Sequence, residues 1–582
     1  MISDFDHFKI TKLSTPYTTT IGTHFNSTAS ITFFDDKNKE LDSYELAFID
    51  IESIYKRIDR GEALILDECY IENFSISKYR KSRNIAEGIV IKLIEFSAKS
   101  AFFNSTIETD FSCTQFVGNQ FSIEGCRFIS GGVSFHEAIF PDGNKHFSKI
   151  LFKNGNVNFS NARFNDGTVD FKYSIFKDGI KNFQYTQFGK GDVLFINTEF
   201  GEGEVNFINA NFGDGNVSFK LAIFKSGIIG FEFSHFGKGD ISFERTEFGN
   251  GFVDFRKVEF NEGKVNFNRA LFGEGDVTFE GSELTDSRMT FKKTDFGNGN
   301  LAFEAVEFKT SDVLFENALF GKGNIYFGKS LFKNLSLISC HLNHYCDLRV
   351  FQAEYIDLSG TISRDIIDLA PYGNEVKIDC LNLAGMRLVG QIYIDWYENK
   401  VYESIIKQHN TSNTEKAEQF RILKENYSRL GNYKYEDLAY IQFKRFEQKA
   451  EFYTAIRKSK LNAIWQYPLF AFKFITIDRM GLYATSPSRV IVSLITVYVI
   501  FSLIHLVCPY CMDTGISCIP QDASFISRVL STFYYSIITF TTVGYGDCCP
   551  IGFLRLVAGF EAFAGPFMMS YFTVAFARKI LR

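Results

Sequence analysis

The hydrophobic positions of the chain follow two different patterns, one before and one after about residue 485. From Phe159 to Phe327 a phenylalanine recurs every twelve residues. A second phenylalanine follows each of these by five residues, with Leu284 as the exception. A valine or isoleucine often precedes the first phenylalanine by two residues, and glycine pairs fill the gaps. Beyond residue 485 the chain contains long apolar runs instead.

The twelve-residue unit F-x-x-A-x-F-G-x-G-x-V-x predicts short strands that stack into a solenoid. A glycine inside a helix costs about 1 kcal/mol, so repeated glycine pairs argue against helices. Val-x-Phe places two side chains on one face of a strand, and glycine permits the turn that follows. One unit cannot bury its own phenylalanines, so coils must stack on one another. The coil holds twelve or twenty-four residues; we favour twenty-four, because two Phe and one Val overfill a twelve-residue ring.

The five-residue spacing of the phenylalanines resembles that of pentapeptide-repeat proteins. Those proteins form right-handed, four-sided β-helices with one inward residue in five, whereas this sequence inserts two residues in each second interval. The resemblance implies a β-helix over residues 99–400, preceded by an N-terminal cap and the start of the solenoid in residues 1–98. Charged positions vary from coil to coil, without the grouped Asp, Arg and Lys of polysaccharide-cleaving β-helices, so we expect no enzyme.

Residues 401–485 change to a helical period and form the expected connector. One helical face carries apolar residues spaced three, four and three apart, namely Phe420, Leu423, Tyr427 and Leu430. Gly431 marks a helix end, which predicts a helical hairpin. The aromatic segment from Trp465 to Phe474 has the composition of a membrane interface, and we expect a helix lying on the inner leaflet.

Residues 486–582 contain two apolar segments, 490–507 and 553–577, that are long enough to cross a membrane. Basic residues flank the outer ends of this pair, with Arg489 before the first segment and Arg578 after the second. This distribution predicts a cell-membrane protein with two spans and with its N- and C-termini in the cytoplasm. The N-terminal residues lack the features of a signal peptide, which agrees with that orientation.

The loop between the two segments carries the motif Thr541-Thr-Val-Gly-Tyr-Gly-Asp547. It matches the TTVGYGD signature of potassium channels, so residues 488–580 resemble bacterial two-transmembrane potassium channels. The resemblance implies a homotetramer whose backbone carbonyls replace the water around K⁺. The residues implied in K⁺ coordination are Thr542, Val543, Gly544, Tyr545 and Gly546. Gly544 and Gly546 would supply positive-φ positions, while the side chains of Val543 and Tyr545 would be buried away from the axis.

Further residues around the motif are expected to support the filter or the gate. Residues 524–539 resemble a pore helix, on which Tyr534 and Tyr535 correspond to the aromatic pair that braces the filter in this family. The expected filter-supporting residues are Thr541, Asp547, Tyr534, Tyr535 and Glu561. Ile538 occupies the pore-helix position where the family often has an acidic residue.

The second apolar segment contains an acidic residue with two possible interpretations and a Gly-Pro pair with a predicted mechanical role. Glu561 is either a functional membrane carboxylate or a structural hydrogen-bonding group behind the pore helix. Gly565 and Pro566 predict a kink, because proline removes a helix hydrogen bond and glycine frees the backbone. Their position matches the gating hinge of the family.

The predicted fold is therefore multidomain: an N-terminal β-helix, a helical connector and a C-terminal α-helical pore domain. The leading hypothesis is a potassium-selective channel whose cytoplasmic β-helix regulates the pore or binds an unidentified ligand or protein. The alternative is a membrane-anchored β-helical scaffold. No cofactor is expected; K⁺ is the permeant ion and would bind only through filter carbonyls. A zinc site involving Cys508 and Cys511 is a minor alternative. The net charge of −6, with mixed signs, argues against nucleic-acid binding.

Overall fold

The computed structural model describes residues 5–371, 375–520 and 522–581. The chain divides into two compact units, Met1–His409 and Asn410–Arg582. The first unit contains the solenoid, and the second contains the connector helices and the apolar segments.

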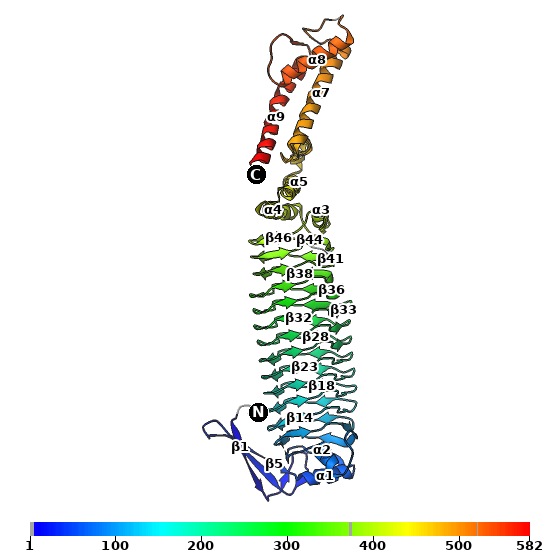
Figure 1. The fold of residues 1–582 in the computed structure, drawn as a ribbon, viewed down its shortest axis with the longest axis vertical. Helices are drawn as coiled ribbons and strands as arrows, with labels where there is room; N and C mark the ends of the chain where they lie inside the picture. The colour runs from blue at the N-terminus through cyan, green and yellow to red at the C-terminus, as the bar shows by residue number, and fades with distance from the viewer. Residues whose placement is uncertain (1–4, 372–374, 521, 582) are drawn as a thin grey trace. The chain divides into compact units, whose positions relative to one another are not determined.

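The first unit begins with an antiparallel cap. Strand β1 (His7–Leu13) pairs with β4 (Thr28–Phe34), which pairs with β5 (Glu40–Phe48). Strand β5 then pairs in parallel with β7 (Cys69–Glu72), so the cap sheet continues directly into the solenoid. Two short helices, α1 (Ile51–Asp59) and α2 (Ile76–Ser82), lie in the same region (Figure 1).

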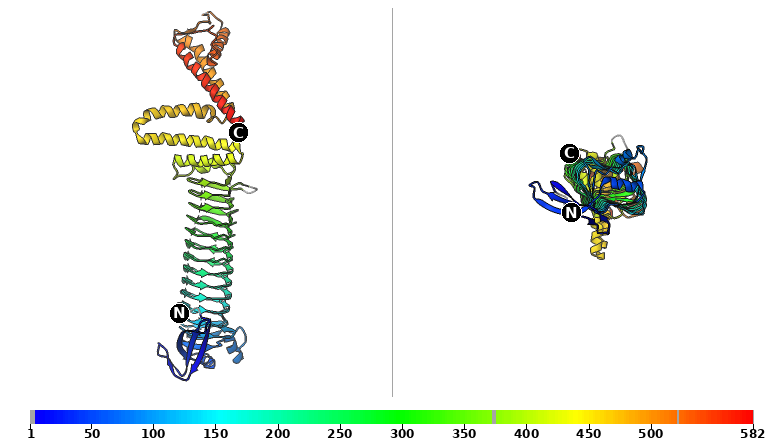
Figure 2. Two further views of the ribbon diagram at one scale, coloured as in Figure 1. Left: turned by 90° about the vertical axis from the view of Figure 1, so that its left-hand side faces the viewer. Right: turned by 90° about the horizontal axis from the view of Figure 1, so that it is seen from below.

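The solenoid consists of parallel strands that stack coil upon coil (Figures 1 and 2). Consecutive coils are offset by 24 residues in the regular part, as in the hydrogen bond from Ile180 N to Asn156 Oδ1. The structure therefore confirms the twenty-four-residue coil. The strands of one continuous side are β10 (Glu108–Asp110), β14 (Gly132–Ser134), β17 (Val157–Asn158), β20 (Lys181–Asn182), β23 (Val205–Asn206), β26 (Ile229–Gly230), β29 (Val253–Asp254), β32 (Val277–Thr278), β35 (Leu301–Ala302), β37 (Ile325–Tyr326), β40 (Cys346–Asp347), β43 (Ile366–Asp368) and β46 (Gln391–Tyr393).

The phenylalanines point inward and stack along the solenoid. The ring of Phe207 stacks on Phe183 at 4.7 Å and on Phe231 at 4.9 Å between centroids. The same ring meets Phe219, from the opposite side of its coil, edge-on at 5.6 Å. These centroid distances match the spacing of about 4.8 Å between neighbouring strands, so each phenyl ring stacks at the height of its own coil. The predicted solenoid with an inward-facing Phe core is confirmed.

The backbone turns at the corners of the coils in two different ways. At glycine corners the coils approach closely: a Cβ on Gly251 would lie 1.6 Å from the carbonyl oxygen of Gly227. Two residues after the first Phe of each unit, the chain adopts a left-handed conformation at residues such as Tyr173 (φ 58°) and Tyr185 (φ 57°), and a glycine, Gly281 (φ 66°), occupies this position in one unit. The sequence pattern did not reveal this second turn, because residues of many types occupy it.

Two lysines occupy the inward position that valine usually fills, Lys181 in the regular part of the solenoid and Lys145 just before it. Lys145 and Lys181 are 0% and 1% exposed. The Lys181 ammonium donates to the carbonyls of Lys177 and Glu202 at 2.8 and 2.7 Å, while that of Lys145 donates to the carbonyl of Asp166 at 2.6 Å. Burial lowers the pKa of both groups to about 8 despite nearby carboxylates.

The last coils and a short helix end the first unit. The last strands of the solenoid are β44 (Lys377–Asn382), β45 (Arg387–Leu388) and β46. Helix α3 (Val401–Ile406) contacts β44 and belongs to the same unit. The compact unit that contains the solenoid therefore also includes α3 and ends at His409.

The second unit begins with the predicted helical hairpin. Helix α4 (Asn413–Arg429) starts at a capping box, and α5 (Tyr433–Lys458) follows a turn at Gly431, whose φ is 71°. A short 3₁₀ segment (Lys460–Asn462) leads into α6 (Ala463–Lys473), which continues as a π-helix, η2 (Phe474–Arg479). The hairpin and the helix over the aromatic segment are confirmed.

Three helices follow in the C-terminal part of the second unit: α7 (Pro487–Cys511), α8 (Phe525–Phe540) and α9 (Leu554–Ile580). They correspond to the predicted first span, pore helix and second span. Short strands β47 (Gly515–Ile516) and β48 (Pro550–Ile551) pair between them. Among the described residues, α7 is the one helix that is long and apolar enough to cross a membrane; α9 does not meet that criterion.

Candidate ion-conduction site

The filter motif lies directly after helix α8, whose C-terminal cap is Thr541. Positive φ angles occur at alternate residues of the motif: 58° at Thr542, 52° at Gly544 and 78° at Gly546. The two glycines therefore occupy positions that other residues resist, as their sequence positions predicted. The left-handed conformation at Thr542 was not foreseen, because threonine rarely adopts it.

Backbone hydrogen bonds join the motif to the end of α8. The amides of Val543 and Gly544 donate to the carbonyl of Ile538 at 2.9 and 3.2 Å. The Thr541 hydroxyl donates to the carbonyl of Ile537 at 2.6 Å, and the Thr542 hydroxyl donates to the carbonyl of Thr541 at 2.7 Å. The position of the motif thus depends on the last turn of α8.

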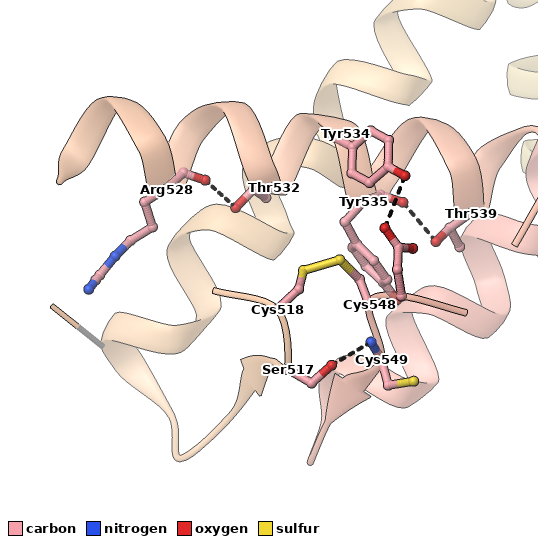
Figure 3. Close-up of a disulfide and its surroundings, with 10 residues drawn as sticks. Ser517, Cys518, Arg528, Thr532, Tyr534, Tyr535, Thr539, Cys548 and Cys549 are labelled. Carbon is pink, nitrogen blue, oxygen red and sulfur yellow. Dashed lines mark hydrogen bonds between the residues drawn. A yellow bond between two sulfur atoms is a disulfide. The ribbon is translucent and has the colours of Figure 1, made fainter. Parts of the chain in front are cut away.

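The two tyrosines of the pore helix have different surroundings (Figure 3). The Tyr534 hydroxyl donates to Asp547 Oδ2 at 3.0 Å, which ties the outer end of the motif back to α8. Tyr535 is 2% exposed and packs in an apolar cluster with Ile516 and Leu554. Of these two side chains, Tyr534 hydrogen-bonds to the motif and Tyr535 packs in the apolar cluster. The two tyrosines therefore make different contacts.

The side chains of Val543 and Tyr545 are exposed in the single chain, at 51% and 73%. The expected burial of these two side chains refers to the four-chain ring, so it stays a prediction. Residues 542–547 are all exposed in the single chain, so the motif leaves uncovered area that another surface can bury.

The C-terminal segment that contains the motif is similar to a known protein family. Residues 491–582 match a family model described as ion channel. This segment is an ion-channel domain. No curated protein and no solved structure matches the chain. The match covers α8, α9, the filter motif and most of α7, so these elements belong to one functional unit, and with the apolar helix α7 it indicates a membrane location.

The ion-channel domain contains a disulfide between Cys518 and Cys548, 30 residues apart (Figure 3). The loop it closes contains helix α8 and the filter motif. Next to it, the amide of Cys549 donates to Ser517 Oγ at 2.8 Å. The sequence left open whether these cysteines pair. In the described part of the chain, no group of three or more His, Cys, Asp or Glu is placed to hold a metal ion, which gives no support to a zinc site at Cys508 and Cys511.

Glu561 lies on α9 and is fully buried in the ion-channel domain. Its carboxylate accepts a hydrogen bond from the Ser536 hydroxyl of α8, and His505 Nε2 of α7 lies 2.9 Å from Glu561 Oε2. These contacts match the interpretation of Glu561 as a hydrogen-bonding group behind the pore helix. The sequence did not single out His505 and Ser536, although a histidine inside an apolar helix indicates a buried polar partner.

Helix α9 continues without interruption through Gly565 and Pro566. A Cβ on Gly565 would lie 1.7 Å from the carbonyl oxygen of Phe540, the last residue of α8. Glycine at this position therefore permits close contact between α9 and the end of the pore helix. A hinge at these residues remains a prediction.

Proposed function

We propose that the chain is a subunit of a potassium-selective channel and conducts K⁺ passively. The observation that supports this most directly is the TTVGYGD motif within an ion-channel domain, with positive φ at Thr542, Gly544 and Gly546. Alternating backbone handedness turns consecutive carbonyls toward one side of the strand. Four such strands would replace the hydration shell of K⁺ with rings of carbonyl oxygens.

The proposed assembly is a homotetramer. One chain supplies a quarter of each carbonyl ring, so conduction requires neighbours around the axis. The exposed side chains of Val543 and Tyr545 are the surfaces that neighbouring chains would cover. The channel would need no cofactor and would not be an enzyme.

The proposed topology has two spans, α7 and α9, with both chain termini on the cytoplasmic side of the cell membrane. The acidic residue inside α9, Glu561, is buried in protein, as expected for a charged group that turns away from lipid. The Cys518–Cys548 disulfide favours a pore loop on the oxidising outer side. Cys69, Cys126, Cys340 and Cys346 of the solenoid unit have buried free thiols, as expected in the reducing cytoplasm.

A flux measurement tests this proposal. The full-length protein reconstituted into vesicles should pass K⁺ far better than Na⁺, and Ba²⁺ should block the flux. Equal permeability to K⁺ and Na⁺ would contradict potassium selectivity. Absence of any flux from correctly inserted protein would instead favour the alternative, a membrane-anchored β-helical scaffold.

We further propose that the solenoid is a cytoplasmic regulatory module that binds a ligand or protein. Within the second unit, the connector contacts the end of α9: Asp437 of α5 lies 3.1 Å from the Lys579 ammonium and 3.5 Å from the Arg578 guanidinium. Arg445 of α5 also forms two hydrogen bonds with the buried Asp478 of η2, at 2.9 and 2.8 Å. Movement of α5 would therefore act directly on the inner end of α9.

A partner on the solenoid could shift an open–closed equilibrium only through different affinities for the two states. Such coupling is typically about 1–3 kcal/mol. Removing residues 1–409 should leave conductance and selectivity intact and should change the open probability. An unchanged open probability would favour a scaffolding or localising role for the solenoid.

A further inference from the structure

Three polar side chains from three different helices meet inside the ion-channel domain. His505 of α7 is 1% exposed, and Ser536 of α8 and Glu561 of α9 are 0% exposed. The Ser536 hydroxyl donates to Glu561 Oε1, and His505 Nε2 lies 2.9 Å from Glu561 Oε2. Each carboxylate oxygen thus has its own partner, and the partners come from the two other helices.

The surroundings of His505 indicate which ring nitrogen is the hydrogen-bond donor in this network. Its Nδ1 has no hydrogen-bond partner among the described residues, so the ring hydrogen belongs on Nε2, where it is donated to Glu561. The ring meets Tyr535 edge-on, with 5.1 Å between centroids. A buried carboxylate without partners would be strongly unfavourable, and these two hydrogen bonds offset much of that penalty.

The network lies one helical turn behind the start of the filter. Ser536 precedes Phe540 by four residues on α8, and Glu561 precedes Gly565 by four residues on α9. Since Gly565 sits directly against the Phe540 carbonyl, α8 and α9 touch at two successive turns. The first contact is the polar network, and the second is the close backbone approach.

We propose that His505, Ser536 and Glu561 are positioning residues for the selectivity filter. This inference rests on the proposed potassium channel function. The filter amides of Val543 and Gly544 hydrogen-bond to the carbonyl of Ile538, on the same turn of α8 as Ser536. Glu561 therefore provides from α9 a carboxylate behind the filter that the Ile538 side chain cannot provide from the pore helix. Displacement of α9 would change the support of the filter without any change in the filter's own residues.

The proposal predicts a specific defect when one hydrogen bond is lost. K⁺ ions in the filter help to hold the four strands apart, so weakened support should matter most when few ions are bound. Ser536→Ala and His505→Leu should leave unitary conductance in high potassium unchanged. Both should make the current decline severalfold faster when external potassium is lowered. The measurement uses full-length tetramers in lipid bilayers.

A conservative variant separates hydrogen bonding from packing. His505→Gln retains an N–H donor on a side chain of similar reach, so its current should decline at nearly the wild-type rate. The double variant Ser536→Ala/His505→Leu should be worse than either single variant, and its effect should differ from the sum of the two, because both residues act on Glu561. If His505→Gln and His505→Leu behave alike, the donor is not what matters and the proposal fails.

Two neighbouring hydroxyls provide matched controls. The Thr532 hydroxyl, one turn earlier on α8, donates to the Arg528 carbonyl of its own helix at 2.8 Å. The Ser502 hydroxyl on α7 donates to the Tyr498 carbonyl at 2.9 Å. Thr532→Val and Ser502→Ala should therefore behave like the wild type. Equal effects of Thr532→Val and Ser536→Ala would overturn the proposal.

The outcomes also separate this proposal from the proposed function. If the wild-type protein does not conduct K⁺ selectively, the channel assignment itself is wrong. If the wild type conducts selectively and the decline in low potassium is unaffected by Ser536→Ala and His505→Leu, only the positioning role is wrong. Should Ser536→Ala fail to assemble, the comparison of the two His505 variants still decides the question.

Discussion

The solenoid and the ion-channel domain differ in how far one chain completes its own structure. In the solenoid, Phe207 and Phe231 are both 0% exposed, because the preceding and following coils of the same chain cover them. In the ion-channel domain, Tyr545 of the filter motif remains 73% exposed. A repeat provides its own neighbours, whereas a conduction site on a symmetry axis requires other chains. Substitutions in the solenoid should therefore change stability, and substitutions in the motif should change function.

The largest expected effect is the loss of selective conduction on replacing Gly544 with alanine. The φ angle of Gly544 is 52°, which disfavours any residue with a Cβ, while no atom lies within 4 Å of that Cβ. The penalty is therefore conformational rather than steric, and the carbonyl directions of the filter should change. Potassium flux in vesicles should fall to background, while the thermal unfolding of the solenoid should not change.

Gly559→Ala provides the control for this variant. Gly559 lies inside helix α9, and a Cβ there also meets no atom within 4 Å. Its backbone is helical, so alanine should be tolerated and potassium flux should persist. If both alanine variants conducted K⁺ selectively, the conformation of Gly544 would not be essential to the pore.

The next largest effect concerns the solenoid core. Phe207→Ala removes a ring that stacks on two neighbours and should lower the free energy of unfolding by about 3–5 kcal/mol. Gln187→Ala, an exposed position of the preceding coil, should change it by less than about 0.5 kcal/mol. Chemical unfolding of the compact unit formed by residues 1–409 measures both. Similar losses for the two variants would contradict the inward assignment of Phe207.

The same difference between the two regions explains what the sequence could predict. The repeat is local and periodic, so its phenylalanines reveal both the solenoid and its inward face. The motif is contiguous, so its chemistry is visible without a structure. The Cys518–Cys548 disulfide and the bond between His505 and Glu561 join separate segments, and no local pattern records such pairings. The burial of Tyr545 stays a prediction, because it depends on other chains.

Within the solenoid, the buried lysines were also missed, because a periodic pattern describes the rule and not its exceptions. Lys181 occupies a position that its neighbours in the stack, Val157 and Val205, fill with apolar side chains. Lys181→Met should therefore raise the free energy of unfolding at pH 7, by about 1–3 kcal/mol, because it removes a buried ammonium group. Urea unfolding of residues 1–409 measures the change.

The pH dependence of this effect has a defined sign. Burial lowers the pKa of Lys181 from 10.5 to about 8, so the unfolded chain binds more protons than the folded chain between those values. The contribution of Lys181 to stability should therefore rise as pH increases from 8 toward 10.5. Lys181→Met should lose this rise, and its advantage over the wild type should shrink with pH. A constant advantage from pH 7.5 to 9.5 would show that Lys181 does not titrate in this range.

The smallest expected effect lies where the connector helix α5 meets the end of α9. Asp437 is buried between two cationic side chains, with the Lys579 ammonium at 3.1 Å. Asp437→Asn keeps the shape and removes the charge, which should change the open–closed equilibrium by about 1 kcal/mol and the open probability up to about fivefold. Unitary conductance and selectivity should not change, because Asp437 contacts α9 at Lys579, 14 residues beyond the contact of Gly565 with the end of α8. Single-channel recording of full-length tetramers measures all three quantities.

A matched control and a charge exchange make this last test decisive. Glu425→Gln removes the charge that pairs with Arg421 at 3.3 Å, in an exposed ion pair on α4. Exposed ion pairs contribute about 0.2–1 kcal/mol or less, and this pair does not contact α9. The open probability of this variant should therefore not change. Exchanging the charges in Asp437→Lys/Lys579→Asp should restore part of the wild-type open probability, because one attraction is rebuilt in the opposite sense. If Asp437→Asn and Glu425→Gln both leave the open probability unchanged, the contact holds α5 in place without influencing the pore. The coupling between connector and pore would then have to pass through Arg445 and Asp478 instead, on the side where the chain enters α7.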